Sequence, residues 1–271
     1  MGVITLTTDF GLSDSYVAQM KGVMLSIAPE SSLIDLTHSI APCDIASAAR
    51  VLAESAGYYP DGTIHLAVVD PGVGGARRRI IIQAAVRTEI DVRPKRAYFV
   101  GPDNGIFALA APALARERVW EIQNHHRLPR FESGRTFDGR NVFAPVAAML
   151  SNGVPASELG SEIATPLVEA EIHAQPIKVD GILKGHVVYF DHFGNAATNI
   201  TKSQLGAGKV IVSLPKQSLT LDLRQSFEDF RTGEPGCIIN SQGCVEIVAN
   251  QQSARKLLAL DAGDPVHITI G

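Results

Sequence analysis

Acidic side chains stand at three places where a β-forming run of the sequence ends. They are Asp9 with Asp14, Asp70, and Asp103 with Asn104. In an open α/β sheet, ligands gather outside the carboxyl ends of the strands, where carboxylates can accept hydrogen bonds or act as a base. Each group alone favours a turn or a helix cap, because Asp and Asn beside Gly are common turn formers. Three groups at one edge favour a binding site, since turns should occur at both edges of a sheet.

The loop from Asp70 to Arg77 carries an acid at one end, a base at the other and glycines between them. It is not a phosphate-binding loop, because no Lys-Ser/Thr pair follows the glycines and a strand rather than a helix comes next. The dinucleotide pattern GxGxxG is also absent. Turn geometry explains the glycines, but it does not explain the two charges. They form either a structural ion pair or a carboxylate held ionised in a dry site.

Two polar segments of the second half, Asp191–Asn195 and Asn240–Gly243, border apolar runs. From their spacing alone, hairpin turns are the favoured interpretation. His125 and His126 are adjacent, so on a strand their side chains would point to opposite faces, and a surface loop is favoured over a metal site. The chain contains neither HxH nor HExxH, and we predict no metal site.

The elements that position these residues alternate between strand and helix in the first part of the chain. Apolar runs predict strands at Val3–Thr7, Leu33–Leu36, Ile64–Val69, Ile80–Val86 and Ala97–Val100. Helices are predicted from a cap at Ser13 or Asp14 to Ile27, from a cap at Asp44 to Ala53, over Phe107–Leu114 and over Val142–Leu150. Strands separated by helices predict a layered α/β domain with a mainly parallel sheet.

The pattern changes near residue 165. Short strands are predicted at Val187–Phe190, Val210–Leu214, Leu219–Leu223, Val245–Val248 and Val266–Ile270, with a helix at Ser253–Leu260. Such a series indicates a small all-β domain, a barrel or a sandwich. We therefore expect an N-terminal α/β domain over 1–164, a linker over about 165–178 and a smaller C-terminal β-barrel domain over 179–271.

The composition, 45% hydrophobic and 19% charged residues in a chain of 271, is that of an ordinary globular protein. The net charge of −4 and the lack of a basic stripe argue against a nucleic-acid partner. No apolar stretch is long enough to span a membrane, and the first residues lack the features of a secretion signal. Three cysteines without CxxC spacing favour neither disulfides nor a zinc site, so we expect a cytoplasmic protein.

Several motifs occur together and in one order along nearly the whole chain. They are Thr8-Asp9-Phe10-Gly11 with Asp14 and Val17–Gly22, His38-Ser39-Ile40, Val69–Gly74, Gly101–Gly105, Thr136–Arg140, Asp191–Asn195 and Ser241-Gln242-Gly243. In this combination the chain resembles the superfamily of S-adenosyl-L-methionine (SAM) hydrolase, also called the hydroxide adenosyltransferase, and of the fluorinase and chlorinase enzymes.

The resemblance implies the same architecture that the patterning predicts, an α/β domain followed by a β-barrel domain. It also implies a homotrimer, with each ligand between the N-terminal domain of one subunit and the C-terminal domain of its neighbour. The implied substrate is SAM and the implied product adenosine, with no cofactor and with neither a nucleic acid nor a membrane as partner.

The resemblance assigns roles to the residues that match the family motifs. Asp9 is expected to hold the two ribose hydroxyls as a bidentate acceptor. Asp14 and Asp191 are expected to bind the methionine ammonium. The remaining contacts are assigned to Ser241 for the carboxylate, Asn195 for the adenine edge, backbone near Asn250 and Gln251 for the rest of the adenine, and Cys43 for the ligand wall.

The implied catalytic group contains Asp70, where the halogenases lack an acid because a carboxylate would repel halide. Hydrolases of this family combine Asp, Arg and His. Asp70 and Arg77 match that set, but the usual Thr-Phe-His-Gly-Arg reads Thr-Phe-Asp138-Gly-Arg here. Asp138 could orient water or pair with Arg77, and two carboxylates beside one Arg could leave one with a raised pKa.

The implied reaction is attack of water on the ribose C5′, with Asp70 orienting the water or acting as its base. Three alternatives stay open. A non-catalytic SAM or adenosine-binding module would bind without turnover. A halogenase would need a halide pocket, which Asp70 disfavours. A Rossmann-type methyltransferase is disfavoured because its Gly-rich first loop is missing.

Overall fold

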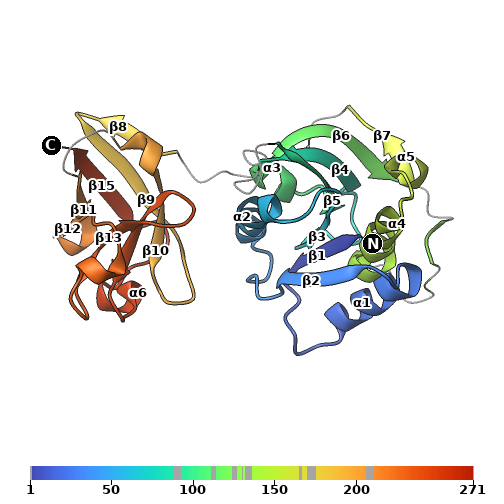
Figure 1. Cartoon of the computed structure of the whole chain (residues 1–271), viewed down its shortest axis with the longest axis horizontal. Coiled ribbons are helices and arrows are strands. Elements are labelled where there is room, and N and C mark those ends of the chain that lie inside the picture. Colours follow the sequence, from blue (N-terminus) through green and yellow to red (C-terminus); the bar gives the residue numbers. More distant parts are fainter. Residues whose placement is uncertain are drawn as a thin grey trace. The chain divides into compact units, whose positions relative to one another are not determined.

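The computed structural model describes residues 2–87, 93–110, 114–123, 127–129, 131, 136–164, 167–169, 175–205 and 210–270 (Figure 1). The chain divides into two compact units, Met1–Ile172 and His173–Gly271, and each unit is described by itself. Among the described residues, no helix combines the length and the apolar character needed to cross a membrane.

The N-terminal unit is built on a mixed sheet with the strand order β2-β1-β3-β5-β4-β6-β7. These strands are β1 (Val3–Thr8), β2 (Ser32–Thr37), β3 (Ile64–Val68), β4 (Arg79–Val86), β5 (Lys95–Pro102), β6 (Leu114–Ile122) and β7 (Gly160–Glu162). The first three strands and β5 pair in parallel, whereas β4, β6 and β7 join by antiparallel pairing. The expected α/β class is confirmed, and the antiparallel strands lie together on one side of the sheet.

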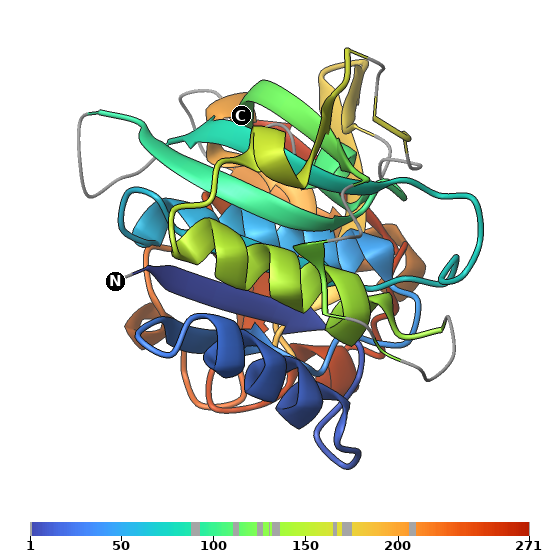
Figure 2. The same ribbon diagram turned by 90° about the vertical axis from the view of Figure 1, so that its right-hand side faces the viewer.

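Helices cover both faces of this sheet. In Figure 2, α1 (Tyr16–Ile27) and α4 (Ala144–Ser151) lie in front of the sheet. Helices α2 (Ile45–Ser55) and α3 (Ile106–Ala110) pack with residues of the opposite face. The unit is therefore a three-layer sandwich in which the strand ends stay open to ligands.

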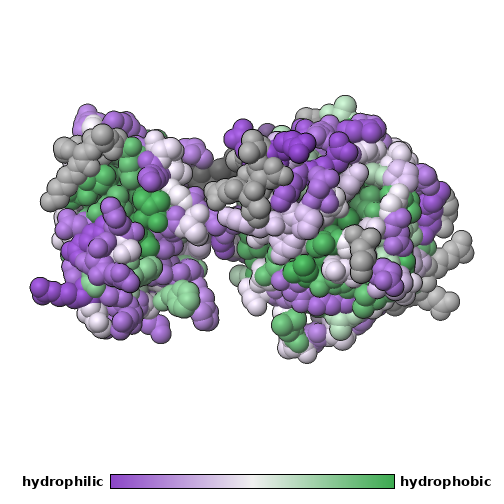
Figure 3. Space-filling view, viewed as in Figure 1, coloured by the Kyte–Doolittle hydropathy of each residue, from purple (hydrophilic) through white to green (hydrophobic). Residues whose placement is uncertain are grey.

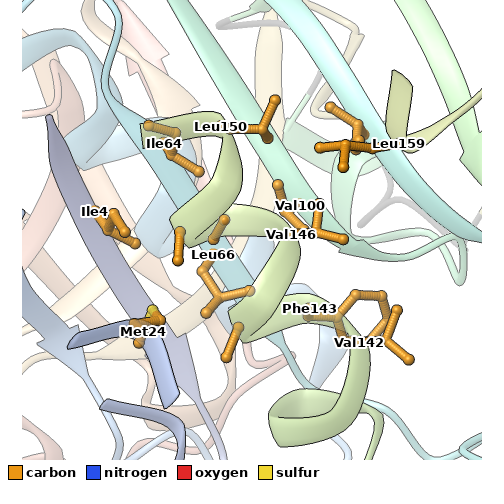
Figure 4. Packing of buried hydrophobic residues seen from close by; sticks show 14 of the residues in the cluster. Ile4, Met24, Ile64, Leu66, Val100, Val142, Phe143, Val146, Leu150 and Leu159 are labelled. Atoms are coloured by element: carbon orange, nitrogen blue, oxygen red, sulfur yellow. The ribbon is translucent and has the colours of Figure 1, made fainter. Parts of the chain in front are cut away.

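Two apolar clusters hold the layers together. One contains Met20 and Met24 of α1 with Ile4 of β1 and Leu66 of β3, and Figure 4 shows these strands beneath Val146 of α4. The other contains Ala48 and Leu52 of α2 with Phe99 and Phe107. Strand β3 is buried on both faces, which explains its near-continuous apolar sequence, while the buried positions of β1 include Thr5, Thr7 and Thr8.

The sequence-based helix ends are partly wrong. The N-cap residue of α1 is Ser15, and its side chain makes no capping bond, so neither Ser13 nor Asp14 caps this helix. The expected cap of α2 is confirmed, since the Asp44 carboxylate accepts the N–H of Ser47 at 3.0 Å. The helix expected to reach Leu114 ends at Ala110, and Leu114 begins β6.

Short helices occupy connections in the N-terminal unit. They are η1 (Ala56–Tyr58), η4 (Gly139–Phe143) and α5 (Ala156–Leu159). The η4 segment is a π-helix that runs directly into α4, and the N–H of Ala144 donates to the carbonyl of Gly139. A π turn of this kind is frequent beside functional sites.

The C-terminal unit is a nearly closed antiparallel barrel with the order β12-β11-β15-β9-β10-β14-β13. The strands are β8 (Ile177–Val179), β9 (Ile182–Phe190), β10 (Ala196–Thr201), β11 (Val210–Leu214), β12 (Leu219–Asp222), β13 (Pro235–Ile239), β14 (Cys244–Ala249) and β15 (Pro265–Ile270). A bridge between Leu223 and Cys237 joins the two ends of this order, and β8 pairs with β9 outside it. The expected barrel is confirmed.

Short helical turns complete the barrel. They are η5 (Lys202–Gln204), η6 (Pro215–Gln217), η7 (Phe227–Asp229) and α6 (Ala254–Leu257). The helix expected over Ser253–Leu260 is thus shorter than predicted, with Ser253 as its N-cap. The interior of the barrel is filled by apolar side chains of alternate strand positions, among them Val187, Val212 and Val266.

Candidate active site

Asp70 and Arg77 form a buried ion pair at the two ends of one loop. Nε of Arg77 donates to both carboxylate oxygens of Asp70, at 2.9 and 3.0 Å. The side chain of Asp70 is only 4% exposed and that of Arg77 only 9%. Gly74 lies at φ +80°, a conformation that side chains disfavour, so a glycine is needed for the loop to turn back. The loop therefore fixes a carboxylate at the end of β3.

Asp138 joins this pair from the segment that precedes η4. Nη2 of Arg77 donates to Asp138, so one guanidinium connects both carboxylates. Nε of Arg79 donates to the same Asp138 oxygen at 2.9 Å. The structure thus brings together the three residues expected to be catalytic, Asp70, Arg77 and Asp138, and adds Arg79.

Arg79 was not predicted from the sequence, although a signal for it exists. In the run Arg77-Arg78-Arg79, the first and third residues share a face because side chains alternate along an extended chain. Arg78 turns to the other side and pairs with the buried carboxylate of Asp103. Two arginines therefore serve one cluster, and the residue between them serves a separate ion pair.

The charge state of Arg77 follows from its surroundings. Burial alone would lower the pKa of the guanidinium, but hydrogen bonds and charges from Asp70 and Asp138 outweigh burial and raise that pKa above its usual value. Arg77 therefore stays charged. Its Nη1 atom is buried and has no hydrogen-bond partner among the residues that the structure describes.

A cavity of about 200 Å³ opens beside this cluster. Its lining consists of Phe10, Tyr16, Val68, Asp70, Val73, Thr136, Phe137, Asp138 and Gly139. The rings of Phe10, Tyr16 and Phe137 meet edge to face, with centroids 5.2 to 6.0 Å apart. These aromatic side chains, whose role sequence reasoning missed, give the cavity an apolar wall opposite two carboxylates.

Asp9 lies in the loop after β1, and several contacts fix that loop. Its Oδ2 atom accepts the backbone N–H of Cys43 at 2.9 Å, where Cys43 has φ 67°. The hydroxyl of Thr8 lies 2.8 Å from Nδ1 of His38, and the carbonyl of His38 accepts the N–H of Gly11 at 2.8 Å. The expected residues Asp9 and Cys43 are therefore in contact.

The other expected polar residues of this unit lie apart from the cavity. Asp14 is exposed in the bend before α1. Asp103 is buried, and besides its ion pair it accepts the N–H of Val168 at 2.9 Å. Asn104 donates to the carbonyl of Val69 at 2.8 Å. Asp103 and Asn104 therefore support the loops around the cavity and do not line it.

The C-terminal unit carries a larger, more open cavity of about 590 Å³. Its lining consists of Asp191, Phe193, Asn195, Phe227, Glu246, Ala249, Gln251, Gln252 and Ser253. Asp191 accepts both the backbone N–H and the side-chain amide of Asn195, each at 2.8 Å. The expected pair of Asp191 and Asn195 is thus held as one rigid polar group.

Gly194, between them, cannot be replaced without movement. It lies at φ +84°, and a Cβ atom there would stand 2.1 Å from Oγ of Ser253. The segment 191–195 therefore packs against the start of α6 at a distance that only glycine allows. The backbone bond from Arg255 to the carbonyl of Gly194, at 2.9 Å, fixes the same approach.

Glu246 is a cavity residue that sequence reasoning missed. It is 7% exposed and accepts a hydrogen bond from Asn240 at 3.2 Å. Burial raises its pKa; the bond from Asn240 opposes this rise, and the charge of Asp191 adds to it. An acid within the apolar strand Val245–Val248 was the signal that could have found it.

Ser241, Asn250 and Gln251 were also expected in the site. Ser241 is exposed in the turn between β13 and β14. The backbone N–H and carbonyl of Asn250 bond to Glu234 and Gly233, so they are already engaged. Gln251, at φ 59°, lines the cavity.

Large apolar side chains are exposed close to both sites. Leu12, two residues after Phe10, and Phe193, in the lining of the larger cavity, are each 73% exposed. Figure 3 shows apolar side chains at the surface of each unit, between stretches of polar ones. The part of the chain that the structure describes holds no group of three side chains suited to a metal ion, while His125 and His126 lie outside the described residues.

Comparisons with known families match both units. The family model for the SAM hydroxide adenosyltransferase N-terminal domain matches residues 4–160, and the model for the C-terminal domain matches residues 185–267. The fold is also that of the crystal structure of an uncharacterized conserved protein from Thermotoga maritima. That structure has a TM-score of 0.86 and 30% sequence identity, covering 99% of this chain and 100% of the other.

Named relatives differ in how similar they are. The chain is 37% identical to the (R)-S-adenosyl-L-methionine hydrolase of Thermus thermophilus, over 99% of this chain and 100% of that protein. It is 28% identical to the fluorinase of an Actinoplanes species, over 98% of this chain and 97% of that protein.

Proposed function

Because the chain belongs to the SAM hydroxide adenosyltransferase family, we propose that it is an enzyme that hydrolyses SAM to adenosine and L-methionine. The observation that carries this proposal is the pairing of Asp70 with Arg77 beside a cavity of about 200 Å³ with an aromatic wall. A buried carboxylate suits an attacking water and repels a halide. Similarity to hydrolases at 32–37% identity, above that to fluorinases at 26–28%, agrees with this assignment.

The proposed step is a displacement at carbon. The water oxygen forms a bond to the ribose C5′, the bond from C5′ to sulfur breaks, and its electron pair stays on sulfur. Methionine leaves as a neutral thioether, so no general acid is required. The proton lost by the water passes to Asp70 or, through it, to solvent. Because the sulfonium is already a good leaving group, we propose that the reaction needs no cofactor.

Asp70 and Arg77 would orient the attacking water, with Asp138 as a second acceptor for the same guanidinium. Asp70 would accept a hydrogen bond from the water and thereby direct a lone pair of the water oxygen toward C5′. Arg77 fixes that carboxylate through two bonds from Nε. The unpartnered Nη1 of Arg77 is a donor that a bound water or substrate atom could satisfy. Positioning and exclusion of bulk water supply much of the rate.

The N-terminal unit would bind the ribose. We propose that Asp9, whose position is fixed by the N–H of Cys43, accepts hydrogen bonds from the two ribose hydroxyls. Cys43 would form part of the ligand wall. Asp14, exposed in the bend before α1, would bind the methionine ammonium.

The C-terminal unit would bind the two ends of the substrate. Asn195, held by Asp191, would read the adenine edge, and Gln251 would contribute backbone contacts together with the segment around Asn250. Asp191 would also attract the ammonium, and Ser241 would donate to the carboxylate of methionine.

We also propose a cytoplasmic homotrimer in which the N-terminal unit of one subunit and the C-terminal unit of its neighbour share each active site. The exposed apolar side chains of Leu12 and Phe193 support such an assembly, because both lie close to residues that line a cavity. A mixing experiment tests it. Asp70→Asn and Asn195→Ala, each impaired alone, should regain activity after mixed refolding, since some sites then have both residues intact. No regain would exclude shared sites.

The reaction is tested directly with purified protein and SAM in ¹⁸O water. Adenosine that carries the heavy oxygen supports hydrolysis by attack at C5′. Intact SAM, with binding seen by calorimetry, would identify a non-catalytic binding module. A parallel incubation with chloride or fluoride would reveal a halogenated nucleoside if the chain were a halogenase.

A further inference from the structure

We propose that Arg79 is a positioning residue of the hydrolytic site. It balances the charge of Asp138, so that Arg77 is not the only cation shared by the carboxylates of Asp70 and Asp138. The proposal rests on the proposed function, because it concerns the group that would orient water. Nothing in the likeness to hydrolases or fluorinases assigns a role to Arg79.

The geometry of Arg79 supports this role. It is the first residue of β4 and pairs with Pro102 of β5, so its backbone belongs to the sheet. Its Nε lies 2.9 Å from Oδ2 of Asp138 and its Nη2 lies 3.3 Å from Oδ1. The guanidinium therefore contacts both oxygens of one carboxylate and holds it in a defined orientation.

The charge balance explains why a second guanidinium is needed. Asp70 and Asp138 have side chains that are 4% and 7% exposed, and Arg77 donates to both. A buried carboxylate without a counter-charge is strongly unfavourable. With Arg77 alone, two negative charges would share one positive charge. Arg79 makes the cluster neutral, with two carboxylates and two guanidinium groups.

The neighbouring charged groups leave this arrangement intact. Arg78 points to Asp103, so it does not compensate Asp138. The phenol of Tyr16, from α1, is the other titratable group in the cavity lining. Within the described residues, Asp138 forms ion pairs with Arg77 and Arg79. Arg140 lies over the ring of Phe137, but its guanidinium bonds to Asn141 and Gln19. Loss of Arg79 therefore removes one of the two cations that pair with Asp138 in the described part of the chain.

The consequence is a change in proton affinity. Without Arg79, the two carboxylates compete for Arg77, and the first proton binds to the pair at higher pH. A protonated pair cannot accept the proton of the attacking water. The acidic limb of the pH profile of kcat/KM, which reports ionisation of the free enzyme, should then move upward.

Three variants test this chain of effects in the full-length protein. Arg79→Met should move the acidic limb upward by about one pH unit. Arg79→Lys, which keeps the charge, should restore most of the profile. In Arg79→Met combined with Asp138→Asn, the unbalanced carboxylate is gone, and the limb should return toward that of the wild type even where the rate stays low. A purely structural role would not produce this return.

The control is Arg118→Met. Arg118 makes a comparable two-pronged pair with Glu162 on the same sheet, but both side chains are about half exposed. This variant should leave the pH profile unchanged. A pH profile of Arg79→Met that superimposes on that of the wild type would overturn the proposal.

A second measurement separates this proposal from the proposed function. The carboxyl carbons of Asp, labelled with ¹³C, report titration by NMR without any substrate. The Asp70→Asn and Asp138→Asn spectra assign the two signals. If the chain does not hydrolyse SAM, the signals should still titrate at higher pH in Arg79→Met than in the wild type. Unshifted titrations would reject the role of Arg79 whatever the reaction is.

Discussion

Arg77 is joined to Asp70 through two nitrogens, since its Nε lies 2.9 and 3.0 Å from Oδ1 and Oδ2 and its Nη2 donates to Oδ2 at 2.5 Å. This geometry orients the carboxylate with the same guanidinium that also reaches Asp138. The two partners are seven residues apart at the ends of one loop, whereas Asp138 reaches the same guanidinium from 61 residues away. The cluster therefore combines one contact that is local in sequence with one that depends on the fold of the whole unit.

Replacement of Asp70 tests the proposed base. Asp70→Asn keeps the shape of the side chain but removes the charge and the capacity to take a proton. Activity should fall by roughly 10²–10⁴-fold, the usual contribution of a positioned base, while the Kd for SAM stays close to that of the wild type. Single-turnover kinetics and calorimetry measure both quantities.

Asp261→Asn provides the control for this change, because Asp261 has a side chain that is 71% exposed in the other unit. It should retain full activity. Activity of Asp70→Asn within about twofold of the wild type would count against any part for Asp70 in the proton transfer.

Asn195→Ala tests the adenine contact. The substitution removes the amide that donates to Asp191 and leaves that carboxylate with one fewer hydrogen bond. The variant also loses the proposed contact with the adenine edge, and a polar group left unsatisfied in this way costs about 1–3 kcal/mol. The Kd for SAM should therefore rise about 10- to 100-fold. Gln225→Ala, at an exposed position of the same unit, should bind SAM normally. Unchanged affinity of Asn195→Ala for both SAM and adenosine would exclude the contact.

Gly194→Ala tests the close approach to Ser253. The added Cβ would lie 2.1 Å from Oγ of Ser253 at a φ of +84°. Gly263→Ala is a matched control, since Gly263 has φ +88° with no atom within 4 Å of its Cβ position. The backbone conformation costs about 1–2 kcal/mol at both positions. Only Gly194→Ala adds the contact with Ser253, so this variant should be less stable than the control. Equal denaturation midpoints would show that Ser253 moves aside at no cost.

His65 links stability to acid. Its ring is buried against Phe99, and its Nδ1 lies 2.8 Å from the hydroxyl of Thr5. Burial lowers the pKa of His65 from 6.5 to about 3. Between these two pKa values, His65 is protonated in the unfolded chain and neutral in the folded chain. The free energy of unfolding therefore falls as the pH drops below 6.5, the pKa of His65 in the unfolded chain. The loss is about 1.4 kcal/mol for each pH unit from this group.

The variant His65→Phe with Thr5→Val cannot take up that proton. Its free energy of unfolding should fall less than that of the wild type between about pH 7 and about pH 4.5. Urea titrations at several pH values measure the difference. Parallel pH dependences in the two proteins would show that His65 is not the group responsible.

The effect of Glu246 on stability changes with pH in the opposite direction to that of His65. Burial raises its pKa, so the folded chain binds a proton more tightly than the unfolded chain, and stability falls as the pH rises from the usual glutamate pKa toward the raised one. Glu246→Gln should therefore raise Tm relative to the wild type more at neutral pH than in acid. Calorimetric scans check this, and a Tm difference that does not change with pH would contradict it.

The fold could be predicted where burial leaves a simple pattern. Strand β3 is buried on both faces, so its sequence is nearly continuously apolar, and Asp70 close behind it stood out. Strand β6 was missed because its exposed side carries Arg116 and Arg118, and such a strand resembles a loop. Its antiparallel pairing with β4 then remained unseen, and the sheet looked more parallel than it is.

The site could be predicted where both partners lie in one segment, as Asp70 and Arg77 do. No local sequence pattern indicates contacts between distant segments, and the pairing of Asp138 with Arg77 could be considered only because of the family resemblance. The bond from Arg79 to Asp138 spans 59 residues, and the aromatic contact between Tyr16 and Phe137 is equally non-local. Family motifs pointed to Asp138 and to Arg77 as a possible partner, but only three-dimensional packing shows that Arg79 is a second cation beside it.

The π turn at Gly139–Phe143 amounts to one extra residue wound into a helix, immediately after Asp138. An α-helix advances about 100° per residue, so deletion of one residue here would turn Asp138 by about that angle relative to α4. The carboxylate would then face away from Arg77 and Arg79, although α4 could keep its own packing. Insertions and deletions in 139–143 should therefore be far less tolerated than substitutions, because they would change the direction in which Asp138 points.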